Sequence, residues 1–352
     1  MRHLSFRSKF VLALLIVLSA VACRKIVEVD DPSGQLTPYT LNLPAGFPNM
    51  KIPADNPLTV EGIALGKMLF FDPILSGDNT MSCATCHKQA FGFTDSSNRF
   101  STGIDGLKGN RNSMPLFNLA WSKGFFWDAG ASNMESQVVG PIENPLEMHE
   151  NLANALAELN AHATYPALFK KVFGGDKITT SMLMRAVAQF ERTMISGNSK
   201  YDQYVQGKTS LSASEQRGLN LYVDMNKGDC NHCHVIGGLF TDFELRNTGL
   251  DSIPVDPGRA RITLNPLDSG KFKTPSLRNI EVTAPYMHDG RFNTLEECIE
   301  HYNTGFRYTS NLDPNLEHTV KGRLSQAEIA DLVAFLKTLT DNEFLNNPVF
   351  RK

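Results

Sequence analysis

Two copies of one short cysteine–histidine pattern constrain this chain more than any other feature. Cys83–His87 (CATCH) and Cys230–His234 (CNHCH) both have the form CxxCH, which is the attachment signature of c-type haem. Two thiols at this spacing can add across the two vinyl groups of one porphyrin, and the adjacent imidazole is then held on one face of the ring, where it binds iron. The sequence therefore predicts two covalently bound haem c groups, with attachment through Cys83, Cys86, Cys230 and Cys233 and iron ligation by His87 and His234.

A single CxxC pair also has other uses. It can form half of a zinc site or a redox-active disulfide. Zinc would need two further ligands near each pair, and a thioredoxin-like site would need a βαβ context; the flanking segments provide neither. The six cysteines also raise the possibility of a disulfide framework. Four of them lie in the two motifs, Cys23 lies in the leader, and Cys298 falls on an expected helix as a buried apolar thiol.

The first residues have the form of an export signal. Arg2, Arg7 and Lys9 precede an apolar run that starts at Phe10 and continues to Cys23. This run is shorter than the roughly 20 apolar residues of a membrane span and matches a secretory signal. We therefore expect residues 1–22 to be a signal peptide, in a periplasmic protein attached to the membrane only by lipid on Cys23. The alternative is a plain cleavage site beside an incidental cysteine.

The rest of the chain has the composition and length of a soluble two-domain protein. Hydrophobic residues make up 41 % of its 352 residues, charged residues 20 %, and the formal net charge is −3. This balance gives no reason to expect a nucleic-acid partner, and a chain of this length is typical of two domains. We expect a tether over residues 23–45, an N-terminal domain over 46–205 and a C-terminal domain over 206–345.

Helical patterns occur in both halves. Helices are expected from about Thr59, over 151–159 and over 180–195. In the second half, Ser212 with Glu215 and Ser325 with Glu328 have the spacing of capping boxes. Long irregular segments surround both CxxCH motifs, which is reasonable if a large apolar cofactor replaces part of the core. The expected fold class is mostly α, with two cytochrome c-like haem domains and long loops.

Several further motifs resemble those of one family, the bacterial dihaem cytochrome c peroxidase/MauG family. The resemblance extends from about Leu65 to Leu339. In the first half it is carried by Gly66–Asp72, Leu75–Gly77, Ser82-Cys83, Phe126–Asp128, Gln137, Pro141-Ile142 and Glu147-Met148, and in the second half by Thr274–Asn279 and Ala284–Arg291.

The resemblance implies roles for particular residues. The first haem would be the peroxidatic one, with His87 proximal, Glu147 as the acid–base residue and Gln137 as a neighbouring polar group. A carboxylate suits this task because it can take a proton from peroxide and return it to the leaving oxygen. The alternative for Glu147 is a cap on the helix expected near Asn151. Trp127 matches a tryptophan between the two haems, and its alternative is a buried packing role.

The chain departs from the peroxidase pattern in two places. Many family members have a histidine that closes the first iron, but no histidine lies between His87 and Glu147. We therefore expect an open, high-spin first haem that needs no reductive activation. Fourteen residues after His288, where methionine is usual, the chain has Tyr302, as in the MauG branch. Tyr302 is the expected second ligand of the C-terminal haem, Met287 and His288 are competitors, and a surface tyrosine is the alternative.

The resemblance also implies a bound ion and a reaction. Asn112, Thr283 and Pro285 match positions that help to hold calcium between the haem domains, in keeping with the preference of Ca²⁺ for oxygen donors. The implied function is reduction of hydrogen peroxide to water with electrons from a small redox protein such as cytochrome c. A MauG-like oxidase that modifies a partner protein is the main alternative, and a non-enzymatic dihaem electron carrier is the other. A homodimer is compatible with the resemblance.

Overall fold

The computed structural model describes residues 35–352. The expected signal peptide, Cys23 and most of the expected tether lie outside this range. From Leu36 to Lys352 the chain forms one compact unit. Among the helices of residues 35–352, none is both long and apolar enough to cross a bilayer.

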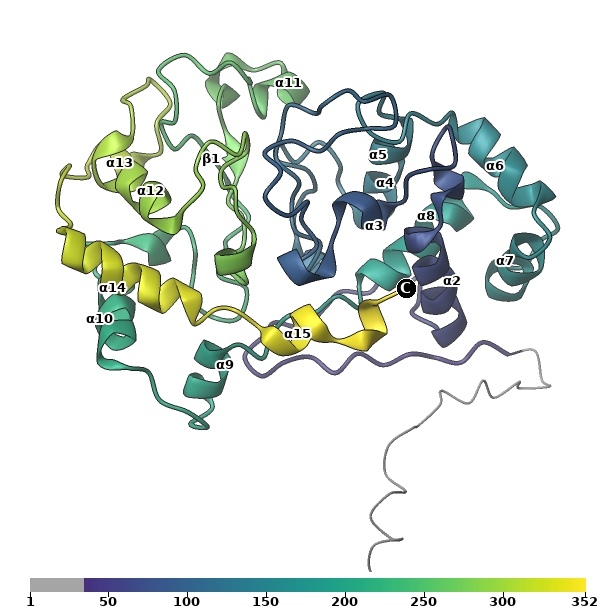
Figure 1. The fold of residues 1–352 in the computed structure, drawn as a ribbon, viewed down its shortest axis with the longest axis horizontal. Helices are drawn as coiled ribbons and strands as arrows, with labels where there is room; N and C mark the ends of the chain where they lie inside the picture. The colour runs from purple at the N-terminus through teal and green to yellow at the C-terminus, as the bar shows by residue number, and fades with distance from the viewer. Residues whose placement is uncertain (1–34) are drawn as a thin grey trace, which may run out of the picture. The chain divides into compact units, whose positions relative to one another are not determined.

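Helices dominate the described chain, as the sequence predicts. One group gathers on one side of Figure 1: α2 (Val60–Phe71), α3 (Cys83–Cys86), α4 (Met134–Gln137), α5 (Val139–Glu143), α6 (Leu152–Ala161), α7 (Tyr165–Phe173) and α8 (Thr180–Glu191). A second group follows: α9 (Lys200–Val205), α10 (Ala213–Val223), α11 (Ala260–Thr263), α12 (Leu295–Glu300), α13 (Pro314–Glu317), α14 (Gln326–Lys337) and α15 (Asn342–Asn346). The sheet of residues 35–352 has two short antiparallel strands, β1 (Leu245–Arg246) and β2 (Phe272–Lys273).

The helix starts follow from local hydrogen bonds. The Thr59 hydroxyl accepts a hydrogen bond from the Gly62 N–H at 3.0 Å and begins α2. Ser212 with Glu215 and Ser325 with Glu328 form the predicted capping boxes of α10 and α14. Such a box satisfies backbone N–H groups that have no partner within the helix.

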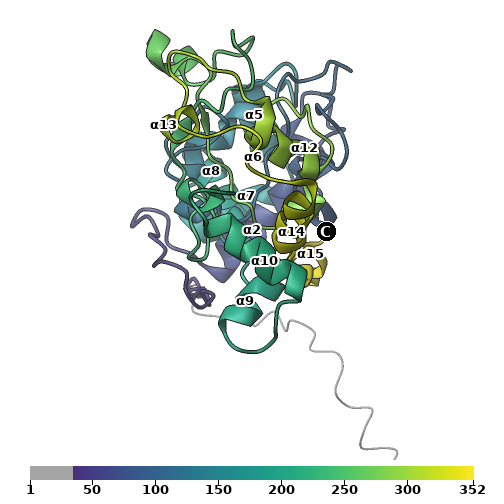
Figure 2. The same cartoon turned by 90° about the vertical axis from the view of Figure 1, so that its left-hand side faces the viewer.

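The two halves share one helix-packing feature. A Cβ added to Gly66 of α2 would lie 1.9 Å from the Ala186 carbonyl oxygen of α8, and one added to Gly218 of α10 would lie 1.9 Å from the Asp331 carbonyl oxygen of α14. Only glycine allows backbones to approach this closely. Figure 2 shows α14 beside α10, consistent with their extensive contact. Each half is therefore built around one closely packed pair of helices.

Separate apolar clusters accompany these helix pairs. The cluster around α2, α6, α7 and α8 includes Leu65, Leu69, Phe169 and Leu183, and that around α10, α12 and α14 includes Tyr222, Phe240, Leu332 and Phe335. Cys298 of α12 packs at the edge of the second cluster, as expected for a buried thiol. The division at residues 205/206 into two domains stays a prediction.

The segments at both ends of the described chain pack against the first half. Part of the expected tether is bound to the fold, because the Tyr39 N–H donates to the Leu58 carbonyl and the Val60 N–H to that of Thr37 (both 2.9 Å). At the other end, α15 leaves the C-terminal helices and runs towards the first half (Figure 1). Its Phe344 packs in an aromatic cluster with Phe93.

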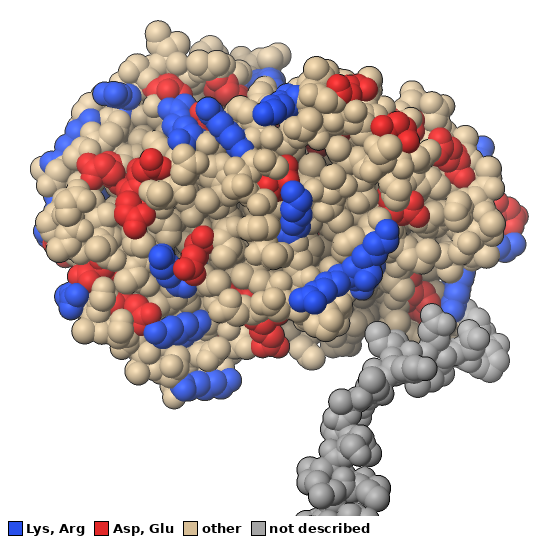
Figure 3. Space-filling model, in the orientation of Figure 1, with Lys and Arg blue, Asp and Glu red and all other residues tan. Residues whose placement is uncertain are grey.

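Charge is distributed evenly over one face of the molecule. On the face in Figure 3, positive and negative side chains are interspersed over both groups of helices. That face therefore presents no broad patch of one sign.

Candidate functional site

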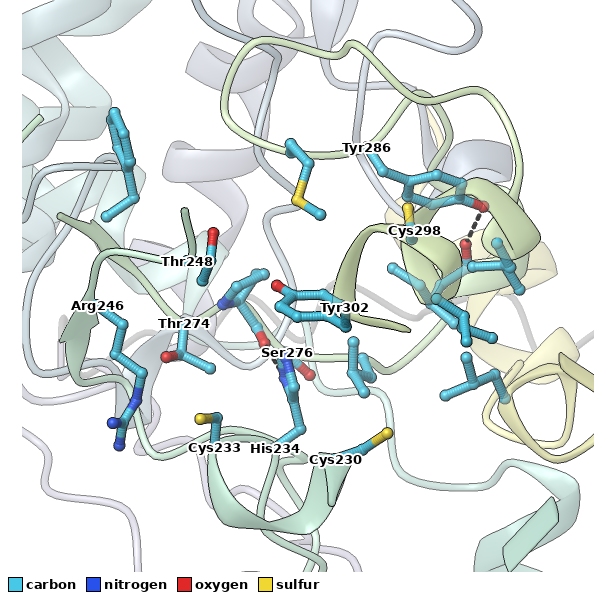
Figure 4. A pocket seen from close by; sticks show the side chains of 18 of the residues that line it. Cys230, Cys233, His234, Arg246, Thr248, Thr274, Ser276, Tyr286, Cys298 and Tyr302 are labelled. Atoms are coloured by element: carbon cyan, nitrogen blue, oxygen red, sulfur yellow. Dashed lines mark hydrogen bonds between the residues drawn. The ribbon is translucent and has the colours of Figure 1, made fainter. Parts of the chain in front are cut away.

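The second CxxCH motif lies at a deep cavity. Figure 4 shows His234 between Cys230 and Cys233, directed towards Tyr302. The cavity walls are mainly apolar, from Leu277, Ile280, Leu295, Ile299, Leu332 and Leu336. A cavity with two thiols at the rim, an imidazole inside and apolar walls has the donor set and polarity that a covalently attached haem requires.

Both motif histidines present one ring nitrogen for metal binding. His87 Nδ1 lies 2.6 Å from the Phe93 carbonyl oxygen, and His234 Nδ1 lies 3.0 Å from the Pro275 carbonyl oxygen. A carbonyl can only accept a hydrogen bond, so Nδ1 carries the proton and Nε2 keeps its lone pair for iron. Burial lowers the pKa of both rings, that of His234 to about 4. Both imidazoles are thus neutral at physiological pH, as metal ligands must be.

A phenylalanine six residues after each histidine repeats this design. Phe93 and Phe240 have left-handed backbones, with φ of 60° and 52°. Such a backbone is unusual for a bulky side chain. Here it turns the chain so that a carbonyl meets the histidine ring: the Phe93 carbonyl meets His87, and that of Phe240 also interacts with His234. The repeat H-x5-F is visible in the sequence, although its meaning is clear only from the structure.

The thiols fit attachment better than zinc or disulfide chemistry. Burial raises the pKa of Cys83 and Cys230 to about 12 and that of Cys233 to about 11. Zinc-binding and redox-active cysteines depend on a lowered pKa, because the thiolate is the reactive form. The environment of these cysteines therefore does not favour either alternative use of a CxxC pair.

Tyr302 lies in the cavity with His234. It belongs to a π-helical turn, His301–Gly305, that continues α12. Such turns are rare and are frequent at functional sites. Burial raises the pKa of Tyr302, while a hydrogen bond with the Thr248 side chain lowers it. Tyr302 is not a surface tyrosine, so that alternative is wrong.

The competing ligands also line this cavity. The His288 ring stacks on Phe272 with centroids 3.7 Å apart and an interplanar angle of 12°. Met287 has a left-handed backbone, with φ of 71°. The stacking engages the face of the His288 ring, whereas Tyr302 and His234 face each other across the cavity in Figure 4.

Glu147 lies close to the first motif. Its charge acts on both Cys83 and Cys86, which places the carboxylate in the same region as the attachment thiols. Glu147 Oε1 accepts a hydrogen bond from Asn144 Nδ2 at 2.7 Å. Burial raises the pKa of Glu147, and the Asn144 hydrogen bond opposes this shift. The carboxyl is therefore held in place and pushed towards the neutral form.

The helix-cap alternative for Glu147 is wrong. Asn151 caps α6, and its side chain accepts a hydrogen bond from the Ala153 N–H. Glu147 instead lies in the turn that follows α5 (Val139–Glu143). Gln137, the partner implied by the resemblance, is the half-buried last residue of α4.

The loop that contains Gly103 and Ile104 packs against Glu147. The Ile104 N–H donates to the Glu147 carbonyl oxygen at 3.0 Å, and Gly103 lies against the backbone of Leu146. The next histidine, His149, is half-exposed, and its Nδ1 lies 2.5 Å from Asp105. His149 is thus tied to a surface carboxylate.

Trp127 lies in a hairpin between the two groups of helices. Its Nε1 donates to the Asn112 carbonyl oxygen at 2.9 Å, and the side chain lines the C-terminal cavity. The next residue, Asp128, pairs with Arg111 at 2.6 Å, and Arg111 also pairs with Asp256 at 2.6 Å. The tryptophan is held from both halves, so its position fits a path between two haems as well as a packing role.

The three residues assigned to calcium line one cavity. Asn112, Thr283 and Pro285 are buried and line the same cavity. The Asn112 N–H donates to the His288 carbonyl oxygen at 2.7 Å, which brings the two halves together here. The hydroxyl of the adjacent Ser113 is buried without a hydrogen-bond partner. A buried polar atom without a partner indicates a missing water or ion.

The burial of two charged residues was not predicted from the sequence. Glu191 of α8 is 5 % exposed, and its Oε2 has no hydrogen-bond partner. Lys273 of β2 is 4 % exposed. The spacing of Glu191 three residues after Ala188 places it on the apolar face of α8, which was a usable signal, whereas nothing in the sequence marks Lys273.

Comparisons with known proteins agree with this site. Residues 60–210 match the family model for di-haem cytochrome c peroxidase. The chain is 37 % identical over 292 residues to the methylamine utilization protein MauG of Methylorubrum extorquens, covering 82 % of this chain and 80 % of that protein. It is 36 % identical over 310 residues to the cytochrome c551 peroxidase of Nitrosomonas europaea, covering 85 % of this chain and 86 % of that protein.

Solved structures support the same relationship. A MauG-like protein associated with microbial copper homeostasis superposes with a TM-score of 0.81 at 35 % identity, covering 89 % of this chain and 98 % of that one. The diheme peroxidase BthA from Burkholderia thailandensis superposes with a TM-score of 0.73 at 24 % identity and supports the fold. The chain therefore belongs to the di-haem cytochrome c peroxidase family, a family of oxidoreductases with two haem c groups that includes both peroxidases and MauG proteins.

Proposed function

We propose that this protein reduces hydrogen peroxide to water with electrons from a small redox protein such as cytochrome c. The observation that carries the proposal is the buried Glu147 beside the first CxxCH motif. Its Oε1 is fixed by Asn144, and no other hydrogen bond to the carboxylate is found within residues 35–352. The second carboxylate oxygen is therefore free to exchange a proton with a small molecule.

The proposed division of roles follows from the contacts of each residue. When bound, the haem held by His87 supplies an iron position for peroxide and the electrons for O–O cleavage. Glu147 accepts the proton of one peroxide oxygen and returns it to the other, so that two protons and two electrons convert each peroxide to two waters. Its raised pKa suits this exchange, because a base is most effective when its pKa lies near the working pH. Asn144 keeps the carboxylate oriented.

Trp127 and Tyr302 serve the second haem in this proposal. Trp127 is bound to the C-terminal half through its carbonyl oxygen, which accepts from the Lys273 N–H at 2.8 Å, and it is the expected route for electrons. Tyr302, across from His234, is the expected second ligand of the C-terminal haem. A tyrosine oxygen in that role would stabilise the ferric and higher oxidation states of a haem held by His234.

The direct test is steady-state peroxide turnover with a reduced cytochrome c. Glu147→Gln removes the proton acceptor while keeping the shape of the side chain. We expect kcat to fall by about 10²–10⁴-fold, the usual contribution of a general acid–base residue. Glu143→Gln is the matched control. It makes the same change in net charge, at a residue that is exposed at the end of α5. Equal turnover in both variants would refute the assigned role of Glu147.

A MauG-like oxidation of a partner protein is the second candidate function, and the position of Tyr302 in the cavity favours it. Tyr302→Phe removes the phenol oxygen, and Tyr308→Phe is its control because Tyr308 is 59 % exposed. We expect the EPR signal of the C-terminal haem to change only in Tyr302→Phe. An unchanged signal would exclude Tyr302 as a ligand and leave Met287 or His288. The second function would be favoured if the protein consumes peroxide without a cytochrome donor and oxidises a side chain of a partner protein.

We also propose that calcium binds beside Asn112, Thr283 and Pro285. The support is their shared cavity and the unpartnered Ser113 hydroxyl. Ca²⁺ accepts carbonyl, amide and water oxygens, so the absence of a carboxylate in this set does not argue against it. A calcium chelator should lower the melting temperature of the holoprotein, and added calcium should restore it. A melting temperature that changes with neither addition would disprove the site.

The proposed location is the periplasm, with lipid on Cys23 as the membrane anchor. The support is the leader-like sequence that ends at Cys23. Cys23→Ala should release the protein from the membrane fraction, and an unchanged distribution would argue against lipidation.

A further inference from the structure

The buried Lys273 has an unusual environment. It is the last residue of β2 (Phe272–Lys273) and is 4 % exposed. Its ammonium donates to the Gly124 carbonyl oxygen at 2.9 Å and to the Ser122 hydroxyl at 3.2 Å. Within residues 35–352 no carboxylate lies at ion-pair distance from it, and burial lowers the pKa of Lys273 to about 8. It therefore remains mostly charged at neutral pH without a counter-charge.

Both hydrogen-bond acceptors of its ammonium belong to the hairpin that carries Trp127. Ser122 and Gly124 begin this hairpin, and the Phe125 N–H closes it by donating to the Ala131 carbonyl at 2.9 Å. The Lys273 backbone N–H also donates to the Trp127 carbonyl oxygen at 2.8 Å. One residue of the C-terminal half thus binds both the start of this hairpin and the backbone of the tryptophan.

Lys273 also lines the C-terminal cavity, with its ammonium turned to the hairpin. Trp127, His234 and Tyr302 line the same cavity. The arrangement is costly, since an unpaired buried ammonium destabilises a fold and an apolar side chain of similar size would not. A role in packing alone does not account for a charge at this place.

We propose that Lys273 is a positioning residue that holds the Trp127 hairpin against the C-terminal half and places a fixed positive charge beside the second haem and Trp127. A positive charge in a water-poor environment makes removal of an electron from nearby groups less favourable. It therefore raises the reduction potential of the second haem. In this way Lys273 makes the oxidised form of the second haem less stable.

The test measures the midpoint potential of the C-terminal haem in the holoprotein. Lys273→Met keeps the apolar stem and removes the charge, and we expect a shift to lower potential. Lys123→Met is the matched control: Lys123 is on the same hairpin but 63 % exposed, where it pairs with Glu244, so solvent should screen its charge. Lys273→Arg keeps a charge and should keep the potential near that of the unmodified protein.

Lys273→Gln covers the case in which Lys273→Met does not retain both haems. Glutamine keeps a hydrogen-bond donor without a charge, so it should also lower the potential. An unchanged potential in the neutral variants, or an equal shift in Lys123→Met, would overturn the proposal. The measurement requires only bound haem, and the result is therefore independent of whether peroxide reduction is the function.

Discussion

At the scale of single residues, the first candidate site depends on one pair of side chains. Asn144 donates to Glu147 Oε1 at 2.7 Å, and this hydrogen bond stabilises the ionised carboxylate. Burial acts in the opposite direction and raises the pKa of Glu147. The working pKa of the carboxyl is the balance of these two effects.

Removing the hydrogen bond should therefore shift the pH dependence of the reaction. In Asn144→Ala the pKa of Glu147 rises further, so the acidic limb of the kcat/KM profile should move to higher pH. Asn151→Ala is the control: Asn151 Oδ1 accepts from the Ala153 N–H as Asn144 Oδ1 accepts from the Leu146 N–H, but Asn151 does not bind Glu147. Its loss should cost about 1 kcal/mol of stability without moving that limb. If the acidic limb of the kcat/KM profile does not move in Asn144→Ala, the pKa of Glu147 does not determine that limb.

Glu191 makes a prediction about stability and pH. Burial raises its pKa from the ordinary 4.5 to about 8, with Arg192 opposing the shift and Glu135 adding to it. Between these values the folded protein binds more protons than the unfolded chain, so this group makes stability fall as pH rises from about 4.5 to about 8. Glu191→Gln stays neutral and should remove that loss. Its melting temperature should exceed that of the unmodified protein at pH above 8 and equal it at pH below 4.5; a pH-independent difference would contradict this reading.

At the scale of elements, α9 depends on one buried ion pair. Arg278 is fully buried and binds both oxygens of Asp202 at 2.7 and 2.8 Å. Its guanidinium also lies over the Phe47 ring, 4.8 Å from the centroid. The pair therefore joins α9, the segment that follows β2 and the N-terminal extended segment at one point.

Breaking this pair should be much more costly than breaking a surface pair. Asp202→Asn leaves a buried arginine charge unpaired, which typically costs about 3–5 kcal/mol. Asp176→Asn is the same substitution in the exposed pair with Lys170 and should cost no more than about 1 kcal/mol. Denaturant unfolding of the two holoproteins compares these values directly, and equal costs would show that Asp202 contributes no more than a surface charge.

At the scale of the whole molecule, short-range patterns were the predictable part. The helices that begin at Thr59, Ser212 and Ser325 follow from neighbouring residues, and so do the two CxxCH motifs. The burial of Lys273 depends on segments far away in the sequence, and no local pattern indicates it, whereas the spacing of Glu191 on the apolar face of α8 was a usable local signal. Tyr302 was found only through a family resemblance, because the π-helical turn that carries it has no simple sequence period.

The C-terminal segment gives a last test of how the halves depend on each other. Phe344 of α15 is 2 % exposed and packs on Phe93 and Phe117 of the first half. Gln89 Nε2 also donates a hydrogen bond to the Phe344 carbonyl oxygen at 2.8 Å.

Phe344→Ala should therefore lower the free energy of unfolding by about 3–5 kcal/mol. The loss should be felt in the first half, although Phe344 belongs to the C-terminal segment. Hydrogen exchange should become faster in α2 and around Phe93 and stay unchanged in α10 and α14. Val349→Ala, at a residue 58 % exposed in the same segment, should change neither region. If α10 and α14 also exchange faster in Phe344→Ala, the two halves unfold as one unit, and α15 stabilises the whole fold rather than the haem environment of the first half alone.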